Sequence, residues 1–292
     1  MEKVRFFRYS GTKNNYTETI NELINTSDNE IYIEPFVGSG AILFNLEKEF
    51  KKYIINDIDR NIINIYKTFK EIDYSYYKEK LDFILEKFTS EEIGFSVSSK
   101  HSKDSYEYKK TKENYYSFRN WFNENHYCTN TKDEGIYCFM LANMVINSLL
   151  RFGPNGMNSS WGNRFYGINE KNFNIIKQRL QKTEIYNEDY KSIFKKYPNA
   201  LYFLDPPYFS QDSSYKGFTE GEFKEFLDII KNKEYIYTDI INKYNENIED
   251  KKLIRKMQST SPLTRRLEKN HEYLFSPLLK NIKEIGIIED EW

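Results

Sequence analysis

The sequence predicts an α/β fold: a mostly parallel, Rossmann-like sheet with helices on both faces and an inserted, mainly helical segment. Near the amino terminus, residues 31–56 contain an apolar strand, a glycine-rich turn and a second strand. Residues 200–204 form another short apolar run, which ends at two consecutive prolines. Between residues 66 and 166 the alternation of strands and helices lapses. Because open α/β sheets bind ligands at the carboxyl ends of their strands, the two ends of the chain are expected to build the ligand site.

Composition limits the class of protein but does not identify a partner. The chain has 292 residues, of which 39% are hydrophobic, enough for a sizeable core. Its 43 Lys and Arg nearly balance its 44 Asp and Glu. A surface for nucleic acid would therefore have to be a local patch rather than a property of the whole chain.

Cysteine usage and hydropathy predict a cytoplasmic, soluble, globular protein. Cys128 and Cys138 are ten residues apart and lack the spacing of a zinc site or a disulfide framework. The three histidines share no metal-ligand spacing, so no metal site is expected. The amino terminus has no apolar signal segment, and Asn143 and Asn147 interrupt the longest apolar stretch.

The amino-terminal third predicts a nucleotide-type site in which strands are followed by short loops. The glycine-rich turn is Pro35-Phe36-Val37-Gly38-Ser39-Gly40, and Asp57 follows the second strand at about the spacing at which an acid meets a ribose. The expected elements are a helix at residues 17–24, a strand at 31–34, an amphipathic helix at 41–50 and a strand at 53–56.

Two features of this loop argue against a dinucleotide. The position three residues after Gly40 is Leu43, where a dinucleotide fingerprint has a third small residue. Glu34 stands where a pyrophosphate would approach, and like charges repel. A ligand with a positive centre and no phosphates, such as S-adenosylmethionine, fits better, although a Gly-x-Gly pair alone is a weak motif.

The sequence Leu204-Asp205-Pro206-Pro207-Tyr208 ends the third apolar strand and predicts the catalytic centre. Proline cannot donate to a sheet, so the strand stops here and the carbonyl of Pro206 is left to accept a hydrogen bond. Asp205 and this carbonyl could accept the two N–H groups of a planar exocyclic amine, while Tyr208 stacks on the base. A carboxylate with a reference pKa of about 3.9 is too weak to deprotonate the amine and would orient it. The alternative is a strand-terminating turn with an Asp cap.

The middle of the chain predicts a separate insert with a basic, aromatic surface. It contains a Ser- and Lys-rich loop at residues 96–103, a helical stretch at 108–122 and a buried helix at 137–150. Residues 151–167, rich in turn-forming residues, carry two Arg and four aromatic residues and predict an exposed hairpin. A second basic segment at residues 251–266 could contact phosphates or form a mobile charged loop.

These motifs together resemble the adenine-N6 DNA methyltransferases of the Dam-like α group, and the resemblance covers nearly the whole chain. It implies a methyltransferase-type sheet, S-adenosylmethionine as methyl donor and the amine of an adenine in double-stranded DNA as acceptor. It also implies three segments: a cofactor-binding part at residues 1–65, a target-recognition domain at 66–166 and a catalytic part at 167–292. The adenine would have to leave the base stack, at a cost of a few kcal/mol.

The resemblance also assigns roles to residues. The segment from Arg8 to Lys13 is similar to the family's Lys-Trp-Ala-Gly-Gly-Lys, with Tyr9 in place of Trp, and Asn187 to Tyr190 is similar to its short Asp-Phe motif. Asp189 would bind the adenine amine of the cofactor, or alternatively be a solvated loop acid. The implied catalytic residues are Asp205, Pro206 and Tyr208, and the implied cofactor-binding residues are Tyr9, Lys13, Glu34, Phe36, Gly38, Gly40, Asp57, Asp189 and Tyr190.

The hairpin resembles the family segment Arg-Tyr-Asn...Gly-x-Phe-Asn-x-Pro-Phe-Gly, which enters DNA beside the flipped base. Met157 and Ser160 replace the usual Phe and Pro, so the recognised sequence can differ. The alternative is a loop that merely closes the insert. The implied DNA-binding residues are Arg151, Asn155, Asn158, Trp161 and Arg164.

Three rival functions are distinguished by the acidic residues of these motifs. A cytosine-N4 enzyme of the same fold would commonly have Ser there, and glutamine-directed protein methyltransferases would have Asn, so Asp205 argues against both. A catalytically silent DNA-binding relative is the non-enzymatic alternative, and the intact acids at Glu34, Asp57 and Asp205 argue against it. A cognate restriction endonuclease is a candidate partner.

Overall fold

The computed structural model describes residues 3–207, 218–256, 259–260, 267–268, 271–282 and 288–289. The chain divides into two compact units, each assembled from three stretches of sequence. The helical unit comprises residues 1–14, 38–45 and 59–185, and the sheet unit comprises residues 15–37, 46–58 and 186–292.

The sheet unit contains most of the strands. Its helices are α1 (Thr17–Asn25), α7 (Tyr190–Lys196), α8 (Glu220–Ile230) and the 3-10 helix η4 (Pro277–Asn281). Its strands are β1 (Ile31–Glu34), β2 (Lys52–Asn56), β6 (Leu201–Leu204), β7 (Glu234–Ile240), β8 (Lys251–Lys256), β9 (Ser259–Thr260), β10 (Leu267–Glu268), β11 (His271–Phe275) and β12 (Ile288–Glu289).

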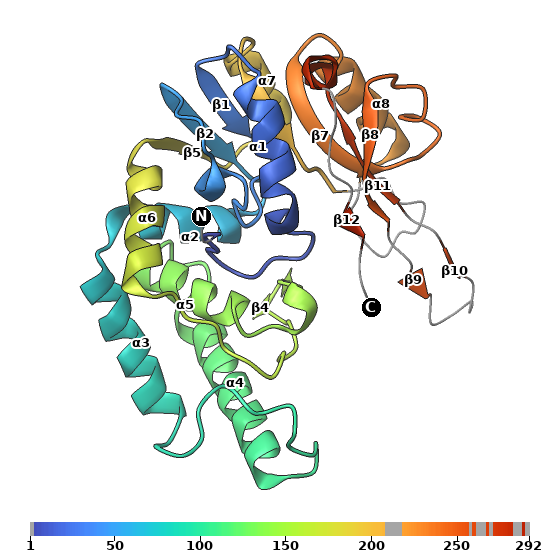
Figure 1. Cartoon of the computed structure of the whole chain (residues 1–292). Coiled ribbons are helices and arrows are strands. Elements are labelled where there is room, and N and C mark those ends of the chain that lie inside the picture. Colours follow the sequence, from blue (N-terminus) through green and yellow to red (C-terminus); the bar gives the residue numbers. More distant parts are fainter. Residues whose placement is uncertain are drawn as a thin grey trace. The chain divides into compact units, whose positions relative to one another are not determined.

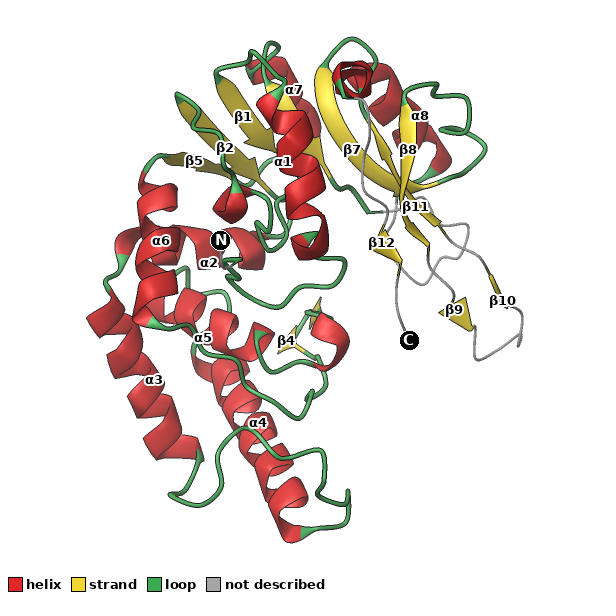
Figure 2. Cartoon of the chain, viewed as in Figure 1, coloured by secondary structure: helices red, strands yellow, loops and turns green. Residues whose placement is uncertain are grey.

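The helical unit is built from five α-helices (Figure 2). Its elements are η2 (Leu43–Asn45), α2 (Arg60–Glu71), α3 (Tyr74–Phe88), α4 (Tyr106–Asn125), α5 (Lys132–Ala142), η3 (Ile146–Ser148), β3 (Phe152–Gly153), β4 (Gly156–Met157) and α6 (Glu170–Gln181). Two elements cross a boundary between the units: η1 (Asn14–Tyr16) and β5 (Thr183–Tyr186).

The main sheet is mixed and has the strand order β12-β8-β11-β7-β6-β1-β2-β5. Strand β1 pairs in parallel with β2 and β6, and β6 pairs in parallel with β7. Strand β11 runs antiparallel to both of its neighbours, β7 and β8. The predicted α/β class is therefore confirmed, with an antiparallel strand on one side of a parallel centre. The carboxyl ends of β1, β2, β6 and β7 consequently lie along one edge of the sheet.

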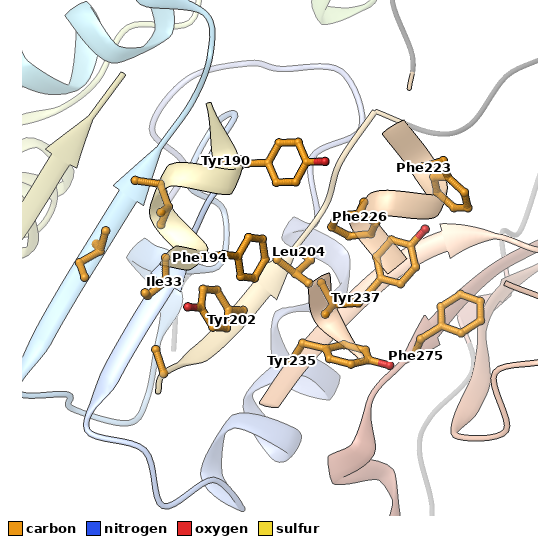
Figure 3. Close-up of a cluster of buried hydrophobic side chains, with 14 residues drawn as sticks. Ile33, Tyr190, Phe194, Tyr202, Leu204, Phe223, Phe226, Tyr235, Tyr237 and Phe275 are labelled. Atoms are coloured by element: carbon orange, nitrogen blue, oxygen red, sulfur yellow. The ribbon is translucent and has the colours of Figure 1, made fainter. Parts of the chain in front are cut away.

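Alternating side chains of the strands fill a core on each face of the sheet. Rings from α7 and α8 pack with one set of strand residues, including Tyr202, Leu204 and Tyr237 (Figure 3). The other face is covered by α1, whose Ile20, Leu23 and Ile24 are fully buried (Figure 1). This alternation explains why the central strands β1, β2 and β6 are mainly apolar, as expected for a sheet covered on both sides.

Several local predictions are confirmed and two are wrong. The strands at residues 31–34 and 53–56 and the helix at 17–24 are present as β1, β2 and α1. Residues 41–50 do not form the expected helix and contain only the short η2. The Asn45 side chain accepts the N–H of Val4 and donates to its carbonyl, both at 2.8 Å, and so holds this segment against the amino-terminal chain.

The second wrong prediction concerns the buried helix of the insert, which was expected at residues 137–150. It occupies Lys132–Ala142 as α5. Asn143 follows it and accepts the N–H of Arg8 at 3.1 Å. Asn147 and Ser148 then adopt positive φ angles of 52° and 57°, which a right-handed α-helix cannot accommodate.

Glu134 stabilises the beginning of α5 from inside the helical unit. Its carboxylate is 1% exposed and accepts N–H bonds from Arg60 and from the backbone of Cys128 and Asn130.

In the part of the chain that the structure describes, no helix is both long and apolar enough to cross a bilayer.

Candidate active site

Three acidic residues stand at the carboxyl ends of neighbouring parallel strands in the sheet unit. Glu34 is the last residue of β1, Asp57 follows β2 and Asp205 follows β6. The strand order places β6, β1 and β2 side by side. Glu34, Asp57 and Asp205, which were expected at strand ends from the sequence, therefore lie along one edge of the sheet.

Glu34 is almost completely buried, with 2% of its surface exposed. Its Oε1 accepts a hydrogen bond from the hydroxyl of Tyr32 at 2.9 Å, which fixes the carboxylate on the strand. A buried carboxylate is stabilised by a nearby positive charge, so this position suits a cationic ligand and disfavours a phosphate.

Asp57 is half-buried, and the path of its backbone is held by the side chain of Asn187. The amide nitrogen of Asn187 donates to the carbonyls of Asp57 at 2.8 Å and Ile58 at 3.1 Å. The loop after β5 therefore supports the loop after β2 and fixes the position of the Asp57 backbone.

Asn56 joins two loops at this edge of the sheet, a role that the sequence analysis did not predict. Its side-chain nitrogen donates to the carbonyls of Pro35 and Glu188, both at 3.0 Å. Its side-chain oxygen accepts the N–H of Glu188 at 2.8 Å, and its backbone carbonyl accepts the N–H of Val37 at 2.9 Å. The only sequence signal for this role was an asparagine at the end of an otherwise apolar strand.

Asp189 is exposed and has a structural task in the described chain. Its side chain accepts the N–H of Lys191 at 2.8 Å and so caps the amino terminus of α7. Contact between Asp189 and a cofactor stays a prediction.

An aromatic cluster lies beside this cap in the sheet unit. The ring of Tyr190 is 5.2 Å from that of Phe36 and 5.5 Å from that of Phe218. The hydroxyl of Tyr190 is buried and has no hydrogen-bond partner among the described residues, and burial raises the pKa of this phenol. A buried hydroxyl without a partner costs about 1–3 kcal/mol, which a bound ligand with a polar group could offset.

Asp205 is half-buried immediately after β6. One of its oxygens, Oδ1, accepts a hydrogen bond from the Thr238 hydroxyl on β7 at 2.9 Å. Pro206 is buried and Pro207 is exposed. Tyr208, the third predicted catalytic residue, lies outside the described residues.

A second buried acid lies next to Asp205 in the sheet unit. Asp239 is fully buried and accepts hydrogen bonds from the Tyr237 hydroxyl, the N–H of Ile240 at 2.7 Å and the Asn245 amide at 3.1 Å. Burial raises the pKa of the Asp239 carboxyl to about 7, and the charge of Asp205 acts in the same direction.

The glycine-rich turn continues from the sheet unit into the helical unit, where it is closely packed. Gly38 and Gly40 have positive φ angles of 47° and 65°. A side chain at Gly38 would meet the Tyr9 ring at 3.1 Å, and one at Gly40 would meet the Tyr66 hydroxyl at 2.6 Å. The Tyr66 hydroxyl also donates to the Gly38 carbonyl at 2.9 Å, so both glycines are required by conformation and by space.

Tyr9 and Lys13 belong to the same unit as these glycines. Lys13 is 3% exposed, and its ammonium group donates to the Gly11 carbonyl at 3.0 Å. The hydroxyls of Thr12 and Ser39 are 3.2 Å apart, which ties the amino-terminal segment to the glycine-rich turn.

Of the exposed hairpin predicted at residues 151–167, the structure has the short antiparallel pair β3–β4, and β4 is buried. Asn123 on α4 holds it, donating to the Met157 carbonyl at 2.9 Å and accepting the Met157 N–H at 2.8 Å. Gly156 permits this contact, because a Cβ there would lie 2.4 Å from the Asn123 oxygen. Four of the predicted DNA-binding residues are exposed: Arg151, Asn155, Asn158 and Arg164.

Trp161 is the exception among the predicted DNA-binding residues. It is 4% exposed, and its indole N–H donates to the Phe95 carbonyl at 3.3 Å. Trp161 packs inside the helical unit, and its contact with DNA stays a prediction. Of the basic segment at residues 251–266, Arg265 and Arg266 lie outside the described residues.

Residues 9–273 match the model of the D12 class of N6 adenine-specific DNA methyltransferases. The chain belongs to this family. It is therefore an adenine-specific DNA methyltransferase, and its methyl donor is S-adenosyl-L-methionine. The resemblance drawn from the motifs is confirmed, and the cytosine-N4 and protein-glutamine alternatives are not supported.

The relatives of the methyltransferase include three proteins from different sources. It is 30% identical over 240 residues to the type II methyltransferase M.MjaIII of Methanocaldococcus jannaschii, covering 77% of this chain and 76% of the relative. It is 24% identical to the type II methyltransferase M.CviBI of Paramecium bursaria Chlorella virus NC1A, with coverage of 77% and 79%. It is also 24% identical to a DNA adenine methylase of Haemophilus influenzae, with coverage of 75% and 69%.

The residues of the sheet unit fit the methyl donor of this methyltransferase. A buried carboxylate at Glu34 complements a sulfonium, which is positively charged. The half-buried Asp57 carboxylate can accept hydrogen bonds from hydroxyl groups. The buried hydroxyl of Tyr190, which has no partner among the described residues, lies among rings that can cover a planar base.

Proposed function

We propose that the methyltransferase acts on an adenine turned out of double-stranded DNA and that Asp205 and Pro206 bind its exocyclic amine. The supporting observation is the half-buried Asp205 carboxylate, fixed at the end of β6 by Thr238 and followed by a proline that cannot continue the sheet. The nitrogen lone pair of adenine is delocalised into the ring. Two acceptors, the Asp205 carboxylate and the Pro206 carbonyl, draw the N–H groups out of the ring plane and make the lone pair available.

We also propose which residues hold the cofactor, which supplies a methyl group already activated on a sulfonium. In the sheet unit Glu34 faces the positive centre, Asp57 accepts from the ribose hydroxyls, and Phe36, Asp189 and Tyr190 hold the adenine. In the helical unit the residues assigned to the cofactor are Tyr9, Lys13, Gly38 and Gly40.

For the chain as a whole, we propose that residues 66–166 form the target-recognition domain and that residues 1–65 and 167–292 supply the catalytic parts. The exposed Arg151, Asn155, Asn158 and Arg164 on and beside the β3–β4 hairpin support this role. A restriction endonuclease remains a candidate partner, because two of the relatives are named type II methyltransferases.

The product provides the first test of the proposed amine chemistry. Incubation of plasmid DNA with the protein and S-adenosylmethionine should yield N6-methyladenine in nucleoside digests analysed by mass spectrometry, because Asp205 and Pro206 present two acceptors to an amino group. A reaction without S-adenosylmethionine is the control. Digests that contain only N4-methylcytosine would contradict the proposal.

The hairpin provides the second test. If Arg151 or Arg164 contacts a guanine edge, its replacement by alanine should remove about 1–3 kcal/mol of discrimination and relax the methylated motif at one position. Modification-aware sequencing of DNA from cells expressing each variant measures the motif. Lys171→Ala, which removes an exposed cation on α6 outside residues 66–166, is the control and should leave the motif unchanged. A uniform loss of methylation at all sites would instead identify the two arginines as phosphate contacts.

A further inference from the structure

We propose that Thr238 is a positioning residue that sets the orientation of the Asp205 carboxylate for methyl transfer. The inference rests on the function proposed above, in which Asp205 binds the adenine amine. Thr238 lies on β7, belongs to none of the motifs described above, and would act by orienting Asp205.

The strand register explains why these two side chains meet. Leu204, the last residue of β6, pairs with Tyr237 on β7, so Asp205, which directly follows β6, lies beside Thr238. Leu204 and Tyr237 both point into the core beneath α7 and α8 (Figure 3). Because successive side chains alternate between faces, Asp205 and Thr238 point to the opposite face of the sheet.

The hydroxyl of Thr238 is a rigid donor. Thr238 is 0% exposed, and its Oγ1 donates to Asp205 Oδ1 at 2.9 Å. A β-branched side chain on a strand has little freedom about χ1, so the direction of the hydroxyl is set by the backbone. A hydrogen bond to one oxygen of a carboxylate restricts rotation of the group and so sets the direction of the second oxygen. An acceptor for an amine has to be oriented within about 10–20° of its productive geometry.

The buried pair of Tyr237 and Asp239 holds the frame around Thr238. The Tyr237 hydroxyl donates to the Asp239 carboxylate, which also accepts the backbone N–H of Ile240 at 2.7 Å. These bonds flank Thr238 on its own strand and are directed to the other face. Thr238 therefore stands on a backbone that is fixed on both sides, as a positioning role requires.

Three variants separate positioning from simple folding. Thr238→Val keeps the shape of the side chain and removes the donor, whereas Thr238→Ser keeps the donor. Thr183→Val is the matched control: Thr183 is 1% exposed, and its hydroxyl donates to the Arg179 carbonyl in the helical unit. Steady-state rates are measured with plasmid DNA and radiolabelled S-adenosylmethionine, and thermal unfolding is recorded for each variant.

Thr238→Val should lower kcat about tenfold and leave the KM for S-adenosylmethionine within about twofold, because the acceptor is misaimed while cofactor binding is untouched. Thr238→Ser should recover most of kcat, and Thr183→Val should keep it. A wild-type kcat in Thr238→Val would overturn the inference, as would equal losses in the valine and serine variants. If Asp205→Ala itself retained full activity, the proposed function would fail; if Asp205→Ala were inactive and Thr238→Val fully active, only the positioning role would fail.

Discussion

Asp205→Ala is expected to lower the rate of DNA methylation by about 10²-fold or more while leaving the affinity for S-adenosylmethionine nearly unchanged. The physical reason is that the carboxylate contacts the amine that receives the methyl group, and its contribution is greatest when that nitrogen becomes tetrahedral. Single-turnover kinetics would measure the rate, and calorimetric titration would measure cofactor affinity.

Asp228→Ala provides the matched control for this experiment, since Asp228 is an exposed acid on α8 in the same unit. It should retain both rate and affinity. Substantial turnover by Asp205→Ala would show that the amine is bound by another group and would refute the catalytic assignment.

Asp57→Ala is expected to weaken the binding of S-adenosylmethionine, whereas Asp205→Ala lowers the rate of methyl transfer. Hydrogen bonds to a charged acceptor contribute about 1.5–3 kcal/mol, so loss of this carboxylate should raise the Kd for S-adenosylmethionine roughly 10- to 100-fold. The backbone of Asp57 should stay in place, because Asn187 holds its carbonyl rather than its side chain.

Calorimetric titration of Asp57→Ala and Asp205→Ala under the same conditions makes each variant the control for the other. At saturating cofactor, Asp57→Ala should regain much of its methylation rate. An unchanged Kd in Asp57→Ala would remove this residue from the cofactor site.

The sequence predicted the strand ends of this fold well, for a simple physical reason. Strands buried on both faces are continuous apolar runs, and a polar or proline residue after such a run marks the place where the sheet stops. Glu34, Asp57 and Asp205 were therefore located correctly at one edge from sequence alone.

Other features could not be predicted, because they depend on contacts between distant parts of the chain. Asn56 and Thr238 are polar residues that no motif singles out, and only the folded structure reveals the partner that each one meets. The loop around Asn45 has the apolar spacing of a helix, yet bonds to Val4 hold it in another conformation. The family resemblance implies DNA contact for Trp161, and sequence alone does not reveal that its indole is buried and donates to the Phe95 carbonyl.

The hydrogen bonds of Asn56 make two loops at this edge of the sheet dependent on each other. The loop after β1 and the loop before α7 are far apart in sequence, yet both are fastened to the same amide, which is 1% exposed. Displacing Pro35 or Glu188 would leave a buried polar group without a partner, at about 1–3 kcal/mol for each group. Substitutions in the two loops are consequently not independent: their free energies should fail to add, and the sequences of the two loops are constrained to change together.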